Sequence, residues 1–515
     1  QFISKLPEVP DLFDSETTIV VRDSKEGWAK AFRQLIALLY SGEIPKWDTS
    51  RVRPSGSRLK TFGGRASGPG PLVDLFNFTI HTFKEAQGYK LSSIQCHDIM
   101  CKIGEVIVMG GVRRSAMISL SNLSDDRMRH AKSGAWWEND SHRALANNSV
   151  AYTEKPDAVS FMREWTALVE SGSGERGIFN REAAKKQAGK YGRRDSDWDF
   201  GTNPCSEIIL RPYQFCNLTE VVVRATDTLE DLERKVRLAT ILGTVQSTYT
   251  KFPYLRKVWQ RNTEEERLLG VSLTGIMDNR LLTSKNKGLD KTLEHLRKVA
   301  VDVNAMWADR LGIPQSTSIT CVKPSGTVSQ LVDSASGIHP RYANYYIRTV
   351  RGDNKDPLTT FMKDQGIPSE PDVMKPDVTT VFSFPIKAPD GAIVTSDLSA
   401  IEQLETWLIY QRHWCEHKPS ITVNVKPDEW FEVGAFVHKH FDEMSGVSFL
   451  PYHEHTYQQA PYQEISSKEY KELESLMPKS IDWSKLSEYE EEDTTKSSQT
   501  LACTGDVCEV VDIGA

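Results

Sequence analysis

Residues 202–223 read TNPCSEIILRPYQFCNLTEVVV, a stretch that joins a chemically reactive cluster to the start of a strand. Asn203, Cys205 and Glu207 place an amide, a thiol and a carboxylate within five residues of one another. If the backbone is extended here, alternate side chains point to one face, and the three groups converge on one small ligand. A purely structural interpretation, a packed cysteine beside a surface glutamate, stays open on these residues alone.

Strands and helices alternate along the rest of the chain. Apolar residues at helical spacing predict helices over 161–168 and 293–311, each followed by a glycine placed to end it. Short β-rich runs lie at 116–120, 220–223 and 318–322. This alternation favours an α/β fold in which at least part of the sheet is parallel.

The composition is that of an ordinary globular protein. Hydrophobic residues make up 39% and charged residues 26%, and 63 Lys and Arg against 70 Asp and Glu give a net charge of −7. A general polyanion-binding surface is therefore not expected, and nucleic acid is not a predicted partner. No apolar run approaches the roughly 18 residues of a membrane span. Because residues 1–15 also lack a signal pattern, we expect no membrane association and a cytoplasmic location.

The run 318–322 leads into a turn that suits an anion. Pro324, Ser325, Gly326 and Thr327 follow the predicted strand, and apolar residues at helical spacing begin at Val328. A strand, a glycine-containing turn and a helix start present unpaired backbone N–H groups and hydroxyls, which bind anions. A helix cap without a ligand is the structural alternative.

The composition changes after about residue 466. A helical stretch ends near Leu476, and the acidic, Ser/Thr-rich run 489–500 has too little apolar surface to order itself, so we expect a mobile linker. Beyond it lie Cys503 and Cys508, and two thiols on a mobile arm suit disulfide exchange with a buried site. A metal site needs about four ligands, and none is predicted. The predicted divisions are a catalytic part (1–465), a helical segment with the acidic linker (466–500) and a redox-active tail (501–515).

Four stretches, in this order along the chain, resemble motifs of the ribonucleotide reductases. Residues 63–69 (GGRASGP) resemble the nucleotide-binding segment of that family, and residues 110–116 (GGVRRSA) resemble its substrate-specificity loop. Residues 202–223 resemble its radical-cysteine finger loop, centred near 203–210, and residues 323–329 (KPSGTVS) resemble its phosphate-binding turn. The likeness covers essentially the whole chain and is greatest to the monomeric, cobalamin-dependent triphosphate reductases. It implies a ten-stranded α/β barrel.

The resemblance also implies a role for each residue of the reactive cluster. Cys205 would form the thiyl radical that takes a hydrogen atom from C3′ of a ribonucleotide, and Glu207 would be the general base for the 3′-hydroxyl proton. Asn203 would bind the sugar hydroxyls, and Cys216 would be one of two thiols that supply the reducing electrons. The residues implied to bind substrate or nucleotide are Ser67, Gly68, Arg113, Arg114, Pro324, Ser325, Gly326 and Thr327.

The second thiol of the reducing pair has no match in this sequence. The family places it on an N-terminal barrel strand, whereas Cys96 and Cys101 lie in a predicted helix and are interpreted as core residues. The chain starts at Gln1 with a segment that reads like the middle of a protein. We therefore expect a fragment or split subunit whose barrel is incomplete at the N-terminus, with a complementing N-terminal segment as a partner.

The radical source follows from the alternatives within the family. The sequence lacks the R-V-x-G-Y motif of glycyl-radical relatives, and its Tyr345-Tyr346 pair lies too early for the tyrosine pair of the oxygen-dependent relatives. Adenosylcobalamin is the remaining cofactor, and the missing D-x-H-x-x-G signature fits reductases that bind it without that histidine. The other implied partners are a ribonucleotide substrate, favoured as a triphosphate with the diphosphate left open, a nucleotide effector, and a thioredoxin-type reductant that acts through Cys503 and Cys508.

Two other classes of function are weighed against this one. A non-catalytic nucleotide-binding fragment or regulator would keep the fold without the chemistry, and the presence of Cys205, Glu207 and Cys216 argues against it. A protein disulfide oxidoreductase predicts a C-x-x-C motif on a small βαβ domain, which this sequence lacks. The sequence therefore favours radical reduction of ribonucleotides.

Overall fold

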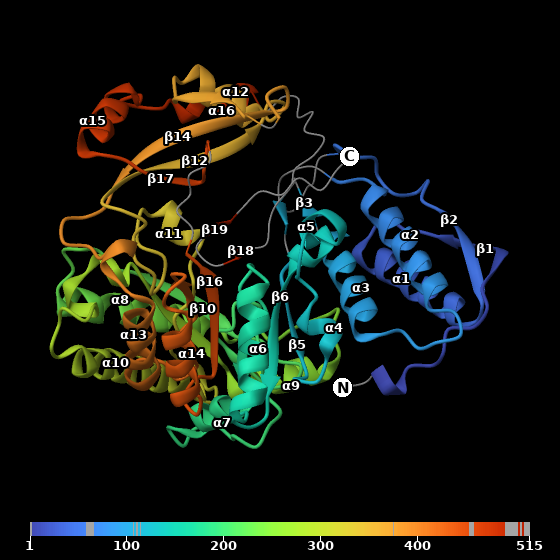
Figure 1. Ribbon diagram of the computed structural model, residues 1–515, viewed down its shortest axis with the longest axis horizontal. Coiled ribbons are helices and arrows are strands. Elements are labelled where there is room, and N and C mark those ends of the chain that lie inside the picture. The colour runs from blue at the N-terminus through green and yellow to red at the C-terminus, as the bar shows by residue number, and fades with distance from the viewer. Residues whose placement is uncertain are drawn as a thin grey trace.

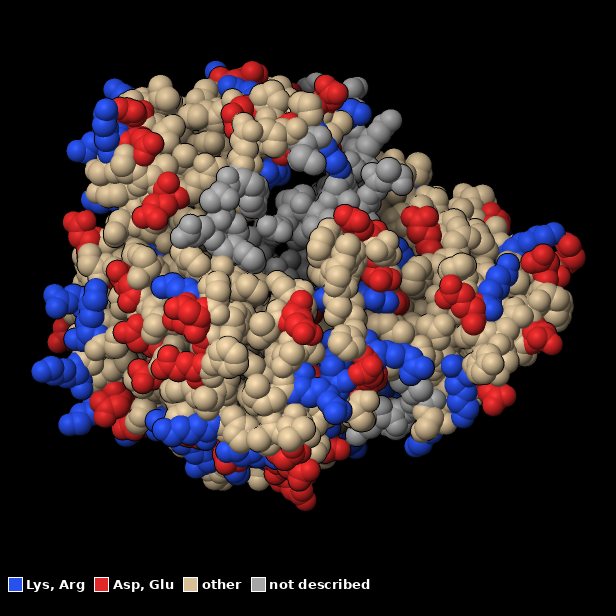
Figure 2. All heavy atoms as spheres, in the orientation of Figure 1, with Lys and Arg blue, Asp and Glu red and all other residues tan. Residues whose placement is uncertain are grey.

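The computed structural model has three parts, which Figure 1 shows together: an N-terminal unit, a larger α/β body, and an antiparallel sheet beyond one end of that body. The structure describes residues 3–57, 66–106, 115–373, 375–452 and 458–489, together with the backbone of residues 108–109, 112–113, 503–504 and 507–508. Within these residues, no helix is long and apolar enough to cross a membrane. Acidic and basic side chains are interspersed over the face drawn in Figure 2, in keeping with the small net charge.

The α/β body is built on a run of mostly parallel strands. A five-stranded sheet has the order β15-β16-β7-β6-β5, in which every neighbouring pair is parallel except β16 and β7. A second sheet pairs β10 with β11 in parallel. The strands of the first sheet are β5 (Met117–Ser121), β6 (Ala146–Tyr152), β7 (Gly177–Asn180), β15 (Thr422–Val425) and β16 (Gly446–Pro451), and those of the second are β10 (Asn217–Val222) and β11 (Leu269–Thr274).

Isolated parallel bridges connect these two sheets. Val271 of β11 bridges to Thr320, and Val322 bridges to Pro419, which leads directly into β15. The predicted strand at 318–322 is therefore present as bridges. Among the described residues, no strand pairs with the outer edge of β5 or of β10, so the run does not close. The predicted α/β class is confirmed, whereas a closed ten-stranded barrel is not seen.

Helices cover the strands of the body and share one large apolar core with them. The predicted helices at 161–168 and 293–311 are confirmed as α6 (Ala158–Glu170) and α10 (Leu289–Leu311). Gly312 ends α10 at φ 63°, a left-handed conformation that glycine adopts without strain. The other helices of the body are α7 (Arg181–Gly189), α8 (Leu229–Gln246), α9 (Lys257–Glu266), α11 (Val328–Leu331), α13 (Ala400–His413) and α14 (Trp430–Lys439).

The N-terminal unit has a core of its own, at the blue end of the chain in Figure 1. Strands β1 (Phe13–Val20) and β2 (Glu43–Asp48) pair in parallel, and α1 (Lys25–Tyr40) and α2 (Gly70–Glu85) pack with them. Buried side chains of Leu35, Leu39, Phe76 and Phe83 form the centre, and truncating one of them to alanine is expected to cost about 2–5 kcal/mol. Helix α3 (Ser93–Val106) follows, then the short elements β3 (Val108–Met109), β4 (Val112–Arg113), α4 (Asp126–Arg129), α5 (Trp136–Asn139) and η2 (Ser141–Leu145).

The third part is an antiparallel sheet with the strand order β13-β14-β12-β17. Its strands are β12 (Tyr345–Asp353), β13 (Ser369–Pro371), β14 (Thr379–Lys387) and β17 (Tyr462–Glu464), and its helices are α12 (Pro357–Asp364), α15 (Ser467–Leu476) and α16 (Leu486–Tyr489). Helix α15 confirms the helical stretch predicted to end near Leu476. The linker prediction over 490–500 lies outside the described residues. Beyond it, β18 (Cys503–Thr504) pairs antiparallel with β19 (Val507–Cys508), which places Cys503 opposite Cys508 in the register.

Candidate active site

The residues of the reactive cluster lie on a hairpin loop. Strands β8 (Gly201–Thr202) and β9 (Ile209–Leu210) pair antiparallel and present residues 203–208 between them. Asn203 closes the loop, because its backbone carbonyl accepts from Ser206 N at 2.9 Å and its Oδ1 accepts from Ile208 N at 2.9 Å. Ser206 has φ 67°, in the left-handed region. An extended backbone, the condition under which the three side chains would share one face, is therefore not met, because the turn at Ser206 breaks the alternation.

Cys205 lies at the edge of a cavity of about 290 Å³. Its residue is exposed, whereas every other cysteine whose side chain is described is buried or half-buried, and none of these cysteines forms a disulfide. The predicted phosphate-binding turn lines the same cavity, so the fold joins two motifs that are more than 100 residues apart in the sequence. Strands β6, β7, β15 and β16 or their flanking loops supply much of the remaining lining, which includes Asn147, Asn148, Glu175, Ser420 and Thr422.

The turn at 323–328 presents polar groups to this cavity. Ser325 has φ 56° and is buried, and its Oγ has no hydrogen-bond partner among the described residues. Its carbonyl accepts from the backbone N of Ser329 and from the Ser329 hydroxyl, which fixes the start of α11. A β-carbon built on Gly326 would meet no atom within 4 Å, so the backbone there is open to an approaching ligand. Lys323 adds a cation, whose Nζ lies 3.7 Å from Glu220.

Glu207 lies beneath the loop rather than in the lining of the cavity. It is 1% exposed, and one of its carboxyl oxygens, Oε2, has no hydrogen-bond partner among the described residues. Burial raises the pKa of the Glu207 carboxyl, and the Asn203 side chain and the positive charges of Lys323 and Lys418 offset only part of this effect. A carboxyl with a raised pKa and a free oxygen is suited to exchange a proton near neutral pH.

Cys216 immediately precedes β10 and is also held behind the loop. Burial raises the pKa of its thiol, and the nearby Glu207 carboxylate adds to the effect, so the thiol stays protonated. A β-carbon on Gly270 of the adjacent strand would approach the Cys216 Sγ to 3.3 Å, so glycine at this position leaves room for the sulfur. Cys321, on the bridged segment beyond β11, is completely buried and packs within the body.

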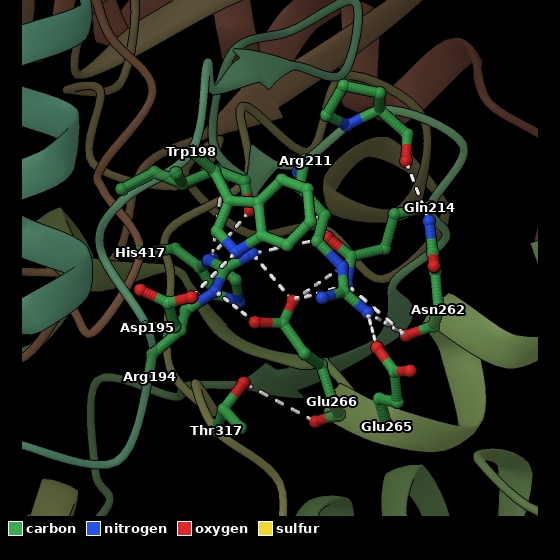
Figure 3. A network of polar contacts seen from close by, with 12 residues as sticks. Arg194, Asp195, Trp198, Arg211, Gln214, Asn262, Glu265, Glu266, Thr317 and His417 are labelled. Carbon is green, nitrogen blue, oxygen red and sulfur yellow. Dashed lines mark hydrogen bonds and ion pairs between the residues drawn. The ribbon is translucent and has the colours of Figure 1, made fainter.

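The base of the hairpin is fixed by a buried polar network that the sequence did not reveal (Figure 3). Arg194 is 4% exposed and donates to both carboxylate oxygens of Glu266, at 3.1 and 3.0 Å. It also donates to the carbonyl of Ile209 at 2.9 Å, while the backbone N of Ile209 donates to His417 Nδ1 at 3.2 Å. Both backbone polar groups of Ile209 are thus bound by side chains, one from Arg194, 15 positions away, and one from His417, 208 positions away. Arg194 and Glu266 are 72 residues apart, and no local pattern links them.

His417 has a defined tautomer in this network. Its Nε2 donates to the carbonyl of Leu269 at 2.9 Å, which leaves Nδ1 free to accept from Ile209. Burial lowers the pKa of His417, and the positive charge of Arg194 lowers it further, so the ring is neutral. The tip of the loop is held as well: Ser420 Oγ donates to the Cys205 carbonyl at 2.6 Å, and Asn147 Nδ2 donates to the Pro204 carbonyl at 2.9 Å.

Other predicted site residues do not meet at this cavity in the described part of the chain. Ser67 and Gly68 lie before α2 in the N-terminal unit, and Gly68 has φ 72°. Residues 63–65 and Arg114 lie outside the described residues, and of Arg113 only the backbone, in β4, is described. Cys503 and Cys508 are likewise described by their backbone pairing.

One cluster away from the cavity has the spacing of a metal site. Donor atoms of Asp98, Asp140 and His142 lie within 4.8 Å of one another. Arg143 donates to Asp98 Oδ2 at 2.7 Å and to Asp140 Oδ2 at 2.9 Å, so a guanidinium already supplies the positive charge that a metal ion would bring. The cluster fixes η2 against α3. Cys96 and Cys101 also lie on α3 and pack with apolar residues, as the sequence predicted.

Comparisons with known proteins agree with this geometry. A family model described as "B12-dependent ribonucleotide reductase, insertion domain" matches residues 11–81, which lie in the N-terminal unit. A crystal structure of a B-12 dependent (class II) ribonucleotide reductase superposes with a TM-score of 0.79 and 25% identity, over 96% of this chain and 76% of that one. Two curated relatives are both named adenosylcobalamin-dependent ribonucleoside-triphosphate reductase. The one from Lactobacillus gasseri is 30% identical over 88% of this chain, and the one from Euglena gracilis is 29% identical over 97% of it.

These likenesses classify the chain. The fold is similar to that of a class II ribonucleotide reductase. Within that class, the chain is homologous to the adenosylcobalamin-dependent reductases along most of its length. It spans 65% of the length of the Lactobacillus gasseri relative and 68% of the length of the Euglena gracilis relative.

Proposed function

We propose that this chain carries the radical site of an adenosylcobalamin-dependent reductase that converts ribonucleoside triphosphates to 2′-deoxyribonucleotides. The observation that supports this most is the shared cavity, in which the exposed Cys205 and the turn at 324–327 face the same space. A nucleotide bound by its phosphates at the turn would present its sugar toward the thiol. Ser325 Oγ and the backbone around Gly326 supply donors, and Lys323 supplies charge for the phosphates.

The proposed reaction begins and ends at Cys205. When bound, adenosylcobalamin supplies radical chemistry through its cobalt–carbon bond, and an exposed thiol at the cavity fits a cofactor that must approach from outside. The Cys205 thiyl takes the hydrogen atom from C3′, Glu207 takes the 3′-hydroxyl proton, and the 2′-hydroxyl leaves as water. Asn203 orients the loop and the sugar hydroxyls. Two thiols, one of them Cys216, supply one hydrogen to the leaving water and one to C2′, and they end as a disulfide. Glu207 then returns its proton to the 3′-oxygen, and Cys205 returns its hydrogen atom to C3′, which restores the thiyl.

The tail is the proposed reductant of that disulfide. Cys503 and Cys508 stand opposite each other in the register of β18 and β19, a backbone arrangement compatible with a reversible disulfide. Replacing both by serine should spare turnover with dithiothreitol but block turnover with thioredoxin. A nucleotide effector is proposed to bind where 63–69 and 110–116 resemble the family, and the protein is proposed to act in the cytoplasm.

The outer edges of β5 and β10, with which no described strand pairs, support the proposal of a complementing partner. A ten-stranded barrel needs further strands at the free edges of β5 and β10, and we propose that a complementing segment supplies them along with the second thiol of the pair. Helix α8, which packs on β10, has an exposed apolar stripe on which such a segment would pack. The exposed fractions are 59% for Leu238, 62% for Leu242 and 38% for Val245, all on one face.

One assay tests the proposal against the alternative of a non-catalytic nucleotide-binding regulator. The chain is incubated with adenosylcobalamin, a ribonucleoside triphosphate and dithiothreitol, with and without the aligned N-terminal segment of a relative as a separate polypeptide. We expect deoxyribonucleotide only when the complement is present. Nucleotide binding without any product under both conditions would favour the regulator, and multiple turnovers by the chain alone would overturn the complementing segment.

A further inference from the structure

Lys418 is a fully buried lysine beneath the loop that carries Cys205. Its side chain is 0% exposed, and its ammonium group donates to two neutral oxygens, Ser206 Oγ at 2.6 Å and the Ser445 carbonyl at 3.3 Å. Burial lowers the pKa of Lys418 to about 7, and the nearby Glu207 carboxylate offsets only part of this effect, so the amine is charged in only part of the molecules at neutral pH. Burying such a group without a hydrogen-bonded carboxylate is costly. The mechanism described above does not use this residue.

The environment of the ammonium group is shaped to hold it. A β-carbon on Gly446 would lie 2.0 Å from Lys418 Nζ, so the absence of a side chain at that position makes the space for the charge. The Phe179 ring lies on another side, with its centroid 5.0 Å from Nζ, at a distance that gives a cation–π attraction. Gly446 on β16 and the Phe179 ring on β7 thus leave a space under the loop that fits a cation.

The segment 418–420 runs alongside the loop and donates hydrogen bonds to two of its backbone carbonyls. Lys418 N donates to the Glu207 carbonyl at 3.2 Å, and Ser420 Oγ donates to the Cys205 carbonyl at 2.6 Å. Within this series of contacts, the Lys418 ammonium is the group that binds the side chain at the turn itself, Ser206. The loop is therefore supported from one continuous piece of chain.

Ser206 needs such support. Its φ of 67° places an L-residue with a β-carbon in the left-handed region, which is sterically strained. Strain of this kind persists only where surrounding contacts impose it. Because Cys205 directly precedes Ser206, the peptide plane that the turn fixes also sets the direction in which the Cys205 side chain leaves the backbone.

We propose that Lys418 is a positioning residue, which locks the turn at Ser206 through its ammonium group and thereby aims the Cys205 thiol into the cavity. This inference rests on the function proposed for Cys205. The Lys418 ammonium group is fully buried and hydrogen-bonded to Ser206 and to the Ser445 carbonyl, so it acts through Ser206 and not on the nucleotide. Its charge also faces the buried Glu207 carboxyl and stabilises the ionised form of that group.

Lys418→Met is the central test, because methionine keeps the apolar stem and removes the charge and the donors. Replacing a buried charge by an apolar side chain is commonly neutral or stabilising, so the midpoint of thermal unfolding should not fall. Amide hydrogen exchange measured by mass spectrometry should rise about tenfold or more in peptides covering 203–209 and stay unchanged in β6 and β11. In the complemented enzyme, kcat should fall about tenfold with KM unchanged, as expected for a group that does not touch substrate.

Two further variants make the result specific. Lys235→Met removes a lysine of α8 that donates to the Val222 carbonyl at 3.0 Å, away from the loop, and should leave loop exchange unchanged. Ser206→Ala removes the acceptor of the same hydrogen bond, so it should raise loop exchange as Lys418→Met does. The double variant should show little more than either single change, because both break one contact. If Lys418→Met fails to fold, the Ser206→Ala measurement decides.

Unchanged loop exchange in both Lys418→Met and Ser206→Ala would overturn the positioning role, as would a uniform rise in exchange over the whole body, which indicates a merely structural lysine. The exchange measurement needs neither cofactor nor substrate. If the loop responds as expected but the wild-type protein with its complement forms no deoxyribonucleotide, the proposed function fails while the positioning role stands.

Discussion

The two walls of the cavity are built in different ways. The turn at 324–327 takes part of its form from its own neighbourhood, where Ser329 binds back to the Ser325 carbonyl. It is also held by Ser272, 51 positions away, whose Oγ accepts from Lys323 N at 2.8 Å. The loop at 203–208 depends on Asn147, 57 positions from its partner, and on Lys418 and Ser420, which are more than 200 positions from theirs. Both walls thus combine local and tertiary contacts, but the wall that carries the reactive thiol depends on contacts from a segment more than 200 positions away. Changes at the two walls should accordingly separate binding from chemistry.

The largest expected effect is at the thiol. Cys205→Ser should abolish deoxyribonucleotide formation and substrate-dependent cleavage of the cobalt–carbon bond, because the O–H bond is too strong to replace S–H. The dissociation constant for a ribonucleoside triphosphate should be unchanged within about threefold, a difference of less than 1 kcal/mol. Product analysis and equilibrium binding measure the two quantities. Substantial turnover by the serine variant would remove the radical role from Cys205.

Breaking the network at the base of the loop should come next. Arg194→Met removes the bidentate partner of the buried Glu266 carboxylate and leaves it only Gln214 and the more distant Arg211. The free energy of unfolding should fall by about 3 kcal/mol. Urea denaturation monitored by circular dichroism gives this value. The double variant with Glu266→Gln should recover part of the loss, since the orphaned charge is then gone. A loss below about 1 kcal/mol, typical of exposed pairs, would show that the network does not hold the loop.

Glu207→Gln tests the chemistry of the same wall without removing the thiol. The amide cannot accept the 3′-hydroxyl proton, so kcat should fall about a hundredfold, within the range of general acid–base catalysis. Cleavage of the cobalt–carbon bond, which precedes the proton transfer, should persist. Steady-state kinetics and cobalamin absorbance follow the two steps, and a decrease in kcat of less than about tenfold would argue against the base role.

The smallest effect is expected at the turn formed by residues 324–327. Ser325→Ala removes a buried hydroxyl without a hydrogen-bond partner among the described residues, so stability should not decrease. Binding of a triphosphate should weaken about tenfold, as expected for the loss of one hydrogen bond to a charged group. Calorimetric titration measures the affinity, and Ser329→Ala, which breaks the contact that shapes the turn, is the matched comparison. Equal affinity in the wild type and Ser325→Ala would exclude this hydroxyl from phosphate binding.

The candidate site could be found in the sequence to a limited depth. Cys205 and the turn at 324–327 were identified from short motifs, and the structure brings them to one cavity. The orientation of Glu207 was left open by the sequence, because a left-handed serine has no reliable local signature and the convergence of the three groups depended on an extended backbone. Arg194, His417 and Lys418 were missed altogether. Each is a common residue type in an unremarkable stretch, and only its burial against a distant partner makes it significant.

By itself the sequence determined the class of fold, the positions of α6, α10 and α15, and the residue types available for radical chemistry. These features depend on periodicity and on residues close together in the chain, where geometry follows from propensity and spacing. Only the tertiary structure decided that the strands form two parallel sets that meet antiparallel at β16 and β7, and that the Cys205 loop is supported from below by Lys418. The physical reason is that a hydrogen bond between residues more than 200 positions apart costs chain entropy, which burial of the surrounding side chains offsets. Neither the entropy nor the burial can be calculated from a local window of sequence.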